Sequence, residues 1–263
     1  MAYLYETHLH TCQASACGRS TGAEHARYYR AIGFDGIMVT DHFFRGNTAI
    51  PRDLPWVERI RRFALGYEDA KAEGDRIGLK VFFGYEENVQ GDEYLVYGIS
   101  PEWMAAHPEM EHWTRREQLL AVHAAGGCVV QAHPFRERDY IERILLARDY
   151  VDAVEVCNAG NHALENRCAH HYARACGFAE TAGSDNHWSR EGLLEAGLIA
   201  GIATEEPLQT IGDWVSLLLN HGRFSLMEVP GRPDTGRPEA CTEVFMLDGQ
   251  ERPVRSAVDW RMG

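Results

Sequence analysis

The sequence predicts an α/β fold, specifically a distorted (β/α)7 barrel of the TIM type that spans residues 1–229. Strand-like and helix-like segments alternate along the chain, and a glycine follows most of the helical segments. Ionisable side chains gather at the carboxyl ends of the strand-like runs. Strands that alternate with helices form parallel sheets. About seven such units in one domain favour a barrel over an open sheet.

The expected strands are short and rich in β-branched, aliphatic or aromatic residues. They are Leu4–His8, Gly36–Thr40, Leu79–Phe83, Tyr94–Ile99, Cys128–Ala132, Ala153–Cys157, Ala179–Ala182, Ile199–Ala203 and Phe224–Val229. Tyr94–Ile99 also suits an inserted hairpin. The expected helices are Thr21–Ile32, Pro55–Ile77, Thr114–Ala125, Asp139–Ala147, Leu164–Cys176 and Thr210–Asn220. Periodicity fades in residues 230–263, where Pro, Gly, Arg and Glu are frequent, and we expect a surface-wrapping or loosely ordered C-terminal extension there.

Charge and cysteine usage exclude some classes of protein. A net charge of −13 argues against nucleic acid or a membrane surface as a non-specific partner. An anionic substrate stays compatible with this charge where bound cations dominate the local field. The seven cysteines show no regular spacing, and no apolar run approaches the ~18 residues of a membrane span. With no leader-like segment visible, these features favour a cytoplasmic protein with reduced thiols.

Side chains of the metal-ligand type follow several of the expected strands. In a parallel barrel all carboxyl ends share one face, so residues far apart in sequence converge there. His8 and His10 lie two residues apart and leave the same side of their strand. Imidazole and carboxylate together favour zinc, manganese or iron over calcium or magnesium. The candidate metal ligands at these positions are His8, His10, His42, Glu86, His133, Asp185 and His187.

Each of these residues also has an ordinary structural interpretation. A lone His-x-His is common by chance, Asp41-His42 suits a helix cap, and His133-Pro134 suits a turn. The coincidence of such residues at many strand ends makes a metal site the better interpretation. The other histidines are interpreted as surface or packing residues, and His162 is the least secure of these.

Five short motifs follow one another along the chain. They are Tyr5-Glu6-Thr7-His8-Leu9-His10-Thr11, Val39-Thr40-Asp41-His42, Gly84-Tyr85-Glu86, Gln131-Ala132-His133-Pro134 and Gly183-Ser184-Asp185-Asn186-His187. Their order and spacing resemble the polymerase and histidinol phosphatase (PHP) family of metal-dependent phosphoesterases over roughly residues 3–205. The resemblance implies a distorted seven-stranded barrel with two or three divalent ions. By this resemblance, His8, His10, Glu86 and Asp185 hold one ion, Glu86 bridges to a second ion that His133 also binds, and His42 and His187 hold a third.

Two positions depart from the family pattern. Ser15 stands where many members carry an aspartate or histidine, so the third ion is weak, absent or helped by a cysteine. Cys17 is the cysteine within reach, although a buried free thiol is the more ordinary interpretation. Glu93 stands where many members carry a histidine, and it offers an oxygen ligand to the second ion.

The resemblance and the ligand set predict hydrolysis of a small phosphate ester by a hydroxide that bridges two ions of Zn, Mn or Fe. Arg136 is the preferred guanidinium for the phosphoryl charge, ahead of Arg19 and Arg45, and His42 or His187 would protonate the leaving oxygen. Three alternatives stay open. They are hydrolysis of an amide or cyclic ester by the same chemistry, a nuclease activity that the acidic chain disfavours, and a non-catalytic metal-binding scaffold.

Overall fold

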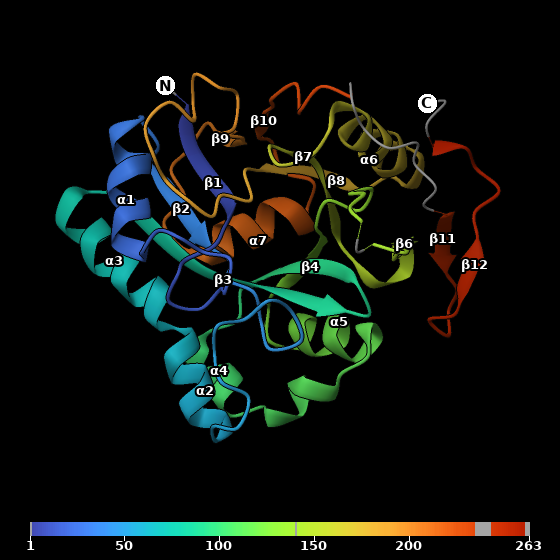
Figure 1. Cartoon of the computed structure of the whole chain (residues 1–263), viewed down its shortest axis with the longest axis horizontal. Helices are drawn as coiled ribbons and strands as arrows, with labels where there is room; N and C mark the ends of the chain where they lie inside the picture. Colours follow the sequence, from blue (N-terminus) through green and yellow to red (C-terminus); the bar gives the residue numbers. More distant parts are fainter. Residues whose placement is uncertain (1, 140, 235–242, 261–263) are drawn as a thin grey trace.

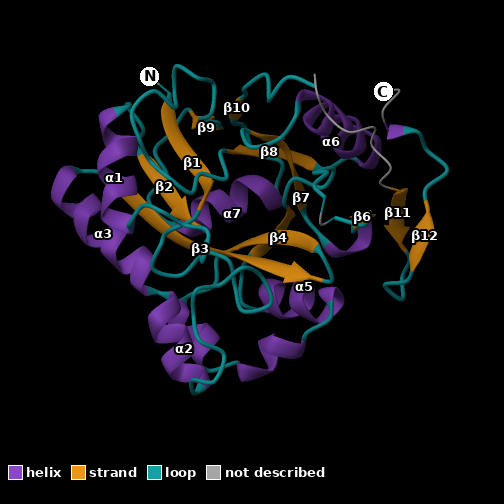
Figure 2. Cartoon of the chain, viewed as in Figure 1, coloured by secondary structure: helices purple, strands orange, loops and turns teal. Residues whose placement is uncertain are grey.

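The computed structural model describes residues 2–139, 141–234 and 243–260. Its centre is a nine-stranded sheet in the order β10-β9-β1-β2-β3-β4-β5-β7-β8. The sheet curves until β8 lies against β1, β9 and β10, which makes a nearly closed barrel with helices outside it (Figures 1 and 2). The expected barrel-like α/β fold is therefore confirmed.

The strands of the barrel are short, as the sequence indicates. They are β1 (Tyr3–Leu9), β2 (Gly36–Val39), β3 (Lys80–Val89), β4 (Asp92–Tyr97), β5 (Cys128–Gln131), β7 (Ala153–Asn158), β8 (Ala179–Gly183), β9 (Gly201–Thr204) and β10 (Ser225–Met227). The helices are α1 (Gly22–Ala31), α2 (Trp56–Phe63), α3 (Leu65–Ile77), α4 (Pro101–Ala105), α5 (Arg115–Ala124), α6 (Ala163–Cys176) and α7 (Ile211–Leu219), with 3-10 turns η1 (Pro108–His112) and η2 (Arg148–Tyr150).

The strands are not all parallel. β1, β2 and β3 run parallel to one another, as do β5, β7 and β8. β4 is antiparallel to both of its neighbours, because the turn at Gln90 and Gly91 folds it back on β3 as a hairpin. β9 is antiparallel to β1 and to β10. The inserted hairpin is confirmed, and the remaining parallel strands all direct their carboxyl ends to one face.

The segment Pro55–Ile77, expected as one helix, forms two helices that meet at Ala64. α3 packs on α1, whereas α2 turns to pack on α4. A Cβ atom on Gly66, in the first turn of α3, would lie 2.0 Å from Oγ1 of Thr11. The close approach of α3 to the loop after β1 therefore requires a glycine at this position.

The expected helix Asp139–Ala147 is wrong. Residues Arg143–Leu146 form strand β6, which pairs in parallel with β11 (Glu243–Leu247), and β12 (Pro253–Arg255) completes a small second sheet (Figure 1). The run Ile144, Leu145 and Leu146 is buried throughout, as a strand covered on both faces is. The hydrogen-bonding partner of β6 lies about a hundred positions later, so local sequence gave no sign of it.

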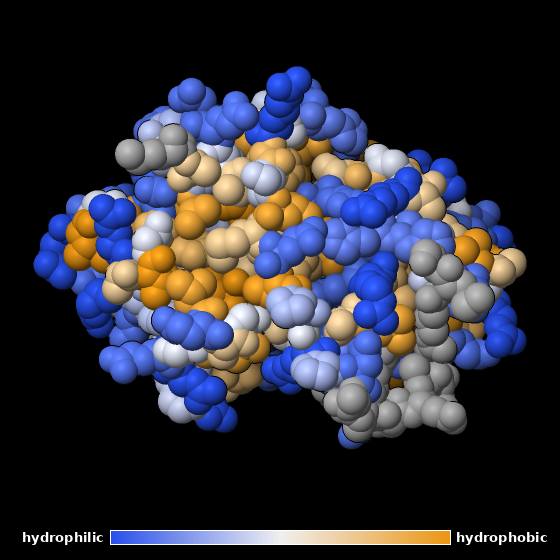
Figure 3. Space-filling view, turned by 90° about the horizontal axis from the view of Figure 1, so that it is seen from above, coloured by the Kyte–Doolittle hydropathy of each residue, from blue (hydrophilic) through white to orange (hydrophobic). Residues whose placement is uncertain are grey.

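Apolar side chains fill the barrel and the layer between barrel and helices. Trp214 of α7 is fully buried and packs at one end of the barrel beside Tyr97 and Leu95. On the surface, Figure 3 shows apolar residues gathered toward the middle of the face seen from above, with hydrophilic residues around them. Within the described residues, every helix is too short or too polar to cross a bilayer.

Candidate metal centre

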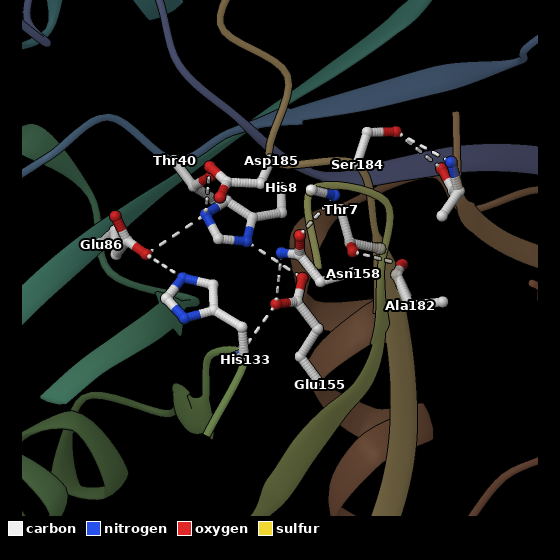
Figure 4. A network of polar contacts seen from close by, with 12 residues as sticks. Thr7, His8, Thr40, Glu86, His133, Glu155, Asn158, Ala182, Ser184 and Asp185 are labelled. Atoms are coloured by element: carbon white, nitrogen blue, oxygen red, sulfur yellow. Dashed lines mark hydrogen bonds and ion pairs between the residues drawn. The ribbon is translucent and has the colours of Figure 1, made fainter. Parts of the chain in front are cut away.

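Glu86 lies at the centre of a cluster of imidazoles and carboxylates. Its Oε1 atom lies 3.3 Å from Nε2 of His8 and 3.2 Å from Nε2 of His133, and its Oε2 atom lies 2.6 Å from Nδ1 of His42. His8 and Glu86 lie in β1 and β3, and His42 and His133 follow β2 and β5, so the four side chains meet at the same end of the barrel. Figure 4 shows the rings of His8 and His133 pointing toward the Glu86 carboxylate.

The first group of donors comes from the end of β1 and the loop after β8. Nε2 of His10 lies 3.0 Å from Nε2 of His8 and 3.0 Å from Oδ1 of Asp185, and His8 lies 3.5 Å from the same carboxylate oxygen. The three side chains are enclosed, with Asp185 the most exposed at 7%. Their donor atoms lie mutually within 4.8 Å, which is close enough for one ion to contact all three.

A second group surrounds the other side of Glu86. His8, Glu86 and His133 form a set that could hold an ion, and His42, Glu86 and Glu93 form another. Oε2 of Glu93 lies 3.6 Å from Nε2 of His133. Glu93 belongs to the antiparallel strand β4, so the hairpin that breaks the parallel order delivers this carboxylate to the cluster.

The third group consists of three histidine rings that stack. The ring of His10 lies 4.2 Å from that of His42 and 4.4 Å from that of His187, measured between centroids. Burial raises the pKa of the Cys17 thiol, but its interactions with His187 and His42 lower it more, so that the pKa falls to about 6. Cys17 thus lies beside the candidate third site, for which Ser15 replaces the aspartate or histidine of the family pattern.

The chemistry of these donors fits divalent cations. Nδ1 of His42 and Oε2 of Glu86 are both buried and neither has a hydrogen-bond partner, although they lie 2.6 Å apart. Two imidazole nitrogens also face each other where His8 meets His10. Buried polar atoms are ordinarily satisfied, and cations shared between these nitrogens and oxygens would satisfy them.

Glu155, which the sequence analysis did not single out, contacts His8 on the side of its ring that faces away from the other donors. Oε1 of Glu155 lies 3.0 Å from Nδ1 of His8, on the opposite side of the ring from Glu86. Its Oε2 accepts hydrogen bonds from the backbone N–H of His133 at 3.0 Å and from Nδ2 of Asn158 at 2.9 Å. A carboxylate behind a ligating histidine fixes its tautomer and orientation. The available signal was a glutamate inside the buried strand β7.

Ser15 and Asp41 also act behind the donors. The Ser15 hydroxyl donates to Oδ1 of Asp41 at 2.6 Å and accepts from the backbone N–H of His42 at 2.9 Å. Asp41 also accepts from the backbone N–H of Thr11 at 2.6 Å. These bonds tie the loop after β1 to the end of β2, and so hold His10 and His42 in place.

His25 lies in α1 directly behind His10. Its Nε2 lies 3.0 Å from the His10 carbonyl oxygen, and its Nδ1 lies 2.8 Å from Oγ of Ser189. Burial lowers the pKa of His25 to about 4, so the ring is neutral near pH 7. The packing role expected for this histidine agrees with its complete burial.

Arg136 reaches the centre from the loop after β5. Its Nη1 lies 2.6 Å from Oδ2 of Asp185, its Nη2 donates to Oδ1 of Asn158 at 2.8 Å, and its Nε donates to Oδ1 of Asn161 at 2.9 Å. A guanidinium has five N–H groups, so two remain beyond these three contacts. Asp185 itself has φ of 55°, an uncommon conformation for a non-glycine residue that functional sites often contain.

Other charged side chains near the ends of the strands lie away from the donors. Glu87 follows Glu86 in sequence but points to the other side of β3, where it pairs with Nε of Arg45 at 3.1 Å. Arg19 stacks on Trp188. The structure therefore brings together His8, His10, His42, Glu86, Glu93, His133, Asp185 and His187, and separates them from Glu87.

No family model matches the sequence, and no curated protein matches it significantly. Solved structures do match. A provisionally named metal-dependent phosphoesterase from Bifidobacterium adolescentis is 17% identical with a TM-score of 0.53, and the match covers 83% of this chain and 96% of that one. A two-domain protein from Bacteroides vulgatus that contains a predicted PHP-like metal-dependent phosphoesterase is 12% identical with a TM-score of 0.60, and the match covers 87% and 65% of the two chains.

An amidohydrolase from Chromobacterium violaceum is 16% identical with a TM-score of 0.50, and the match covers 86% of this chain and 98% of that one. These likenesses concern the fold. The chain shares the barrel of the PHP-like proteins, as its motifs predicted.

Proposed function

We propose that this protein is a metal-dependent hydrolase that cleaves a small phosphate ester. The observation that carries the proposal is that His8, Glu86, His133 and Asp185, which four different strands or the loops after them supply, converge on one buried cluster. Two of the structural neighbours are named as metal-dependent phosphoesterases, which supports the choice of ester.

The donors divide into sets for two or three ions of zinc, manganese or iron. His8, His10, Glu86 and Asp185 would hold the first, and Glu86, His133 and Glu93 the second. His42 and His187 would hold the third, with Cys17 in place of the family's usual oxygen or nitrogen ligand. Bound ions supply Lewis-acid activation of water and neutralise charge on a phosphoryl group.

The chain's own residues have defined tasks in this proposal. Glu155 keeps the proton of His8 on Nδ1, so that Nε2 presents a lone pair to the centre. Arg136 positions Asp185 and offers its two remaining N–H groups to a phosphoryl oxygen. His42 or His187 donates a proton to the leaving oxygen if its ring is not held by an ion.

A second candidate is hydrolysis of an amide or cyclic ester. The neighbour named as an amidohydrolase favours this possibility. The same activated water would attack the carbonyl carbon. A neutral carbonyl carries less charge than a phosphoryl group, so a guanidinium such as Arg136 would stabilise it less. Activity on esters of phosphate, compared with activity on amides and lactones, separates the two candidates.

The direct test is turnover by protein loaded separately with Zn²⁺, Mn²⁺ or Fe²⁺, with p-nitrophenyl phosphate as the first substrate. We expect phosphate release that a chelator abolishes and that Glu86→Gln lowers by a factor on the order of 100 or more. Glu87→Gln is the matched control, because Glu87 is equally buried and lies next in sequence but pairs with Arg45. No turnover of any phosphate ester with any of these metals would refute the proposal.

A further inference from the structure

A pocket of about 240 Å³ opens beside the candidate metal centre, and Asp185 and His187 form part of its wall. Trp188, Leu193 and Leu198 add apolar surface to it. The volume lies below the roughly 300–1,000 Å³ of typical ligand pockets, so the pocket suits a compact molecule. Because Asp185 belongs to the donor cluster, a molecule held at the proposed ions would extend directly into this pocket.

Two arginines line the same pocket. The guanidinium of Arg190 lies over the ring of Trp188, with Cζ 4.3 Å from the ring centroid. The backbone of Arg232 is anchored, because its N–H donates to the Asn161 carbonyl at 2.8 Å and its carbonyl accepts from the N–H of Ala163 at 2.9 Å. Segments far apart in sequence, the loop after β8 and the chain after β10, thus each place one arginine at this pocket.

The local charge of the pocket opposes that of the whole chain. Among the described residues that line it, Asp185 is the sole carboxylate, and Arg136 already pairs with it at 2.6 Å. Neither Arg190 nor Arg232 forms an ion pair with another described residue. In a protein of net charge −13, two uncompensated guanidinium groups at one pocket suit an anionic ligand. Guanidinium matches the geometry of carboxylate and phosphate.

We propose that this pocket binds a second anionic group of the substrate, a carboxylate or another phosphate, while the ester phosphate occupies the candidate metal centre. The inference rests on the proposed function, which places the reacting phosphate beside Asp185. Arg190 and Arg232 then determine specificity, and the apolar wall of Trp188, Leu193 and Leu198 contacts the short carbon skeleton between the two anions. A phosphate ester without a second charge leaves both arginines without a ligand.

The first experiment compares kcat/KM for three substrates with the same three-carbon skeleton. These are 1-propyl phosphate, 3-phosphooxypropanoate and 1,3-propanediol bisphosphate. We expect at least one of the doubly anionic substrates to be preferred. Arg190→Ala and Arg232→Ala should each reduce its kcat/KM on the order of tenfold and leave 1-propyl phosphate within about twofold. The preferred member of the pair identifies the second group as carboxylate or phosphate.

The control is Arg30→Ala, which removes the same charge from the exposed last turn of α1. It should change none of the three rates, which excludes a long-range effect of net charge. Equal loss on all three substrates in the Arg190 and Arg232 variants, or no preference in the wild type, would overturn the inference.

A binding measurement separates this inference from the proposed function. Calorimetry compares propylphosphonate with 3-phosphonopropionate and propane-1,3-bisphosphonate, which cannot be hydrolysed as esters. Tighter binding of a doubly charged ligand, lost in Arg190→Ala and Arg232→Ala, would support the pocket even if no ester were cleaved. Turnover without any discrimination between singly and doubly charged ligands would support the metal centre and refute the pocket.

Discussion

The Glu155 carboxylate lies 3.0 Å from Nδ1 of His8, while the other ring nitrogen of His8 faces Glu86 at 3.3 Å. The imidazole is thus held between one carboxylate that accepts its proton and another that lies among the candidate ligands. Such an arrangement makes the geometry of His8 depend on a residue in β7 that no ion would touch.

Glu155→Gln should therefore weaken metal binding and leave the barrel folded. The amide has nearly the same shape but no charge, so it no longer stabilises the Nδ1 proton of His8. We expect affinity for zinc to fall by roughly 10–100-fold, as for other residues behind a metal ligand. Competition with a chromophoric chelator measures this fall. Glu180→Gln in the adjacent β8 is the control, because Glu180 pairs with Arg174 outside the barrel. Equal affinity in wild type and Glu155→Gln would contradict the role assigned to Glu155.

Cys17→Ser should weaken or remove the third ion of the proposed set, because a neutral hydroxyl is a far weaker ligand than a thiolate. Elemental analysis of protein loaded with zinc should show a loss of about one equivalent. Cobalt-loaded wild type should show sulfur-to-cobalt charge-transfer absorption that the variant lacks. Cys12→Ser, at an exposed thiol nearby, should retain both properties. Identical metal content and spectra in Cys17→Ser would show that the thiol is not a ligand.

Glu93→Ala should weaken the second ion, because it removes an oxygen that lies 3.6 Å from Nε2 of His133. Affinity for that ion should fall by at least about tenfold, seen as a weaker second phase in a metal titration. Glu93→His introduces the ligand that the family pattern carries at this position, so it should recover most of the affinity. A titration of Glu93→Ala that matches the wild type would exclude Glu93 from the ligand set.

His25 should make the metal-free protein less stable in acid. Its pKa falls to about 4 on folding, whereas an unfolded histidine titrates near 6.5. Between these values the unfolded chain binds the extra proton, so stability is full above about pH 6.5 and declines as the pH falls toward about 4. The shift corresponds to a contribution on the order of 3 kcal/mol.

Urea unfolding from pH 4 to 7.5 measures this slope. His25→Gln lacks the titrating group, so its free energy of unfolding should vary less with pH than that of the wild type. His112→Gln, at an exposed histidine, should keep the wild-type slope. Parallel curves for wild type and His25→Gln would contradict a neutral buried ring.

Much of the arrangement was predictable because it depends on periodicity and on one topological rule. The short apolar runs of β1, β2 and β5 identify these segments as buried strands in the sequence alone. The carboxyl ends of parallel strands share one face of a barrel. His8 and Asp185 could therefore be placed together although almost the whole barrel separates them in sequence. Glu93 was predicted from the alignment with the family motifs and not from this rule, because it arrives on the antiparallel strand β4.

The predictions of secondary structure and of supporting residues failed where contacts with residues far away in sequence determine the local structure. Residues Arg143–Leu146 become a strand because β11 supplies the hydrogen bonds, and nothing in their own sequence reveals that partner. Glu155 resembled any glutamate in a strand, since only the direction of its side chain separates a surface residue from one that supports His8. The break between α2 and α3 falls at Ala64, where neither a proline nor a glycine marks it in the sequence.

Anomalous scattering at the zinc, manganese and iron absorption edges tests the central claim most directly, on crystals of protein purified without chelator. The account predicts strong peaks within bonding distance, about 2.0–2.3 Å, of His8, His10 and Asp185 on one side of Glu86 and of His133 and Glu93 on the other. Crystals soaked in each of these metals that show no peak among these side chains, or that bind metal only elsewhere, would contradict it.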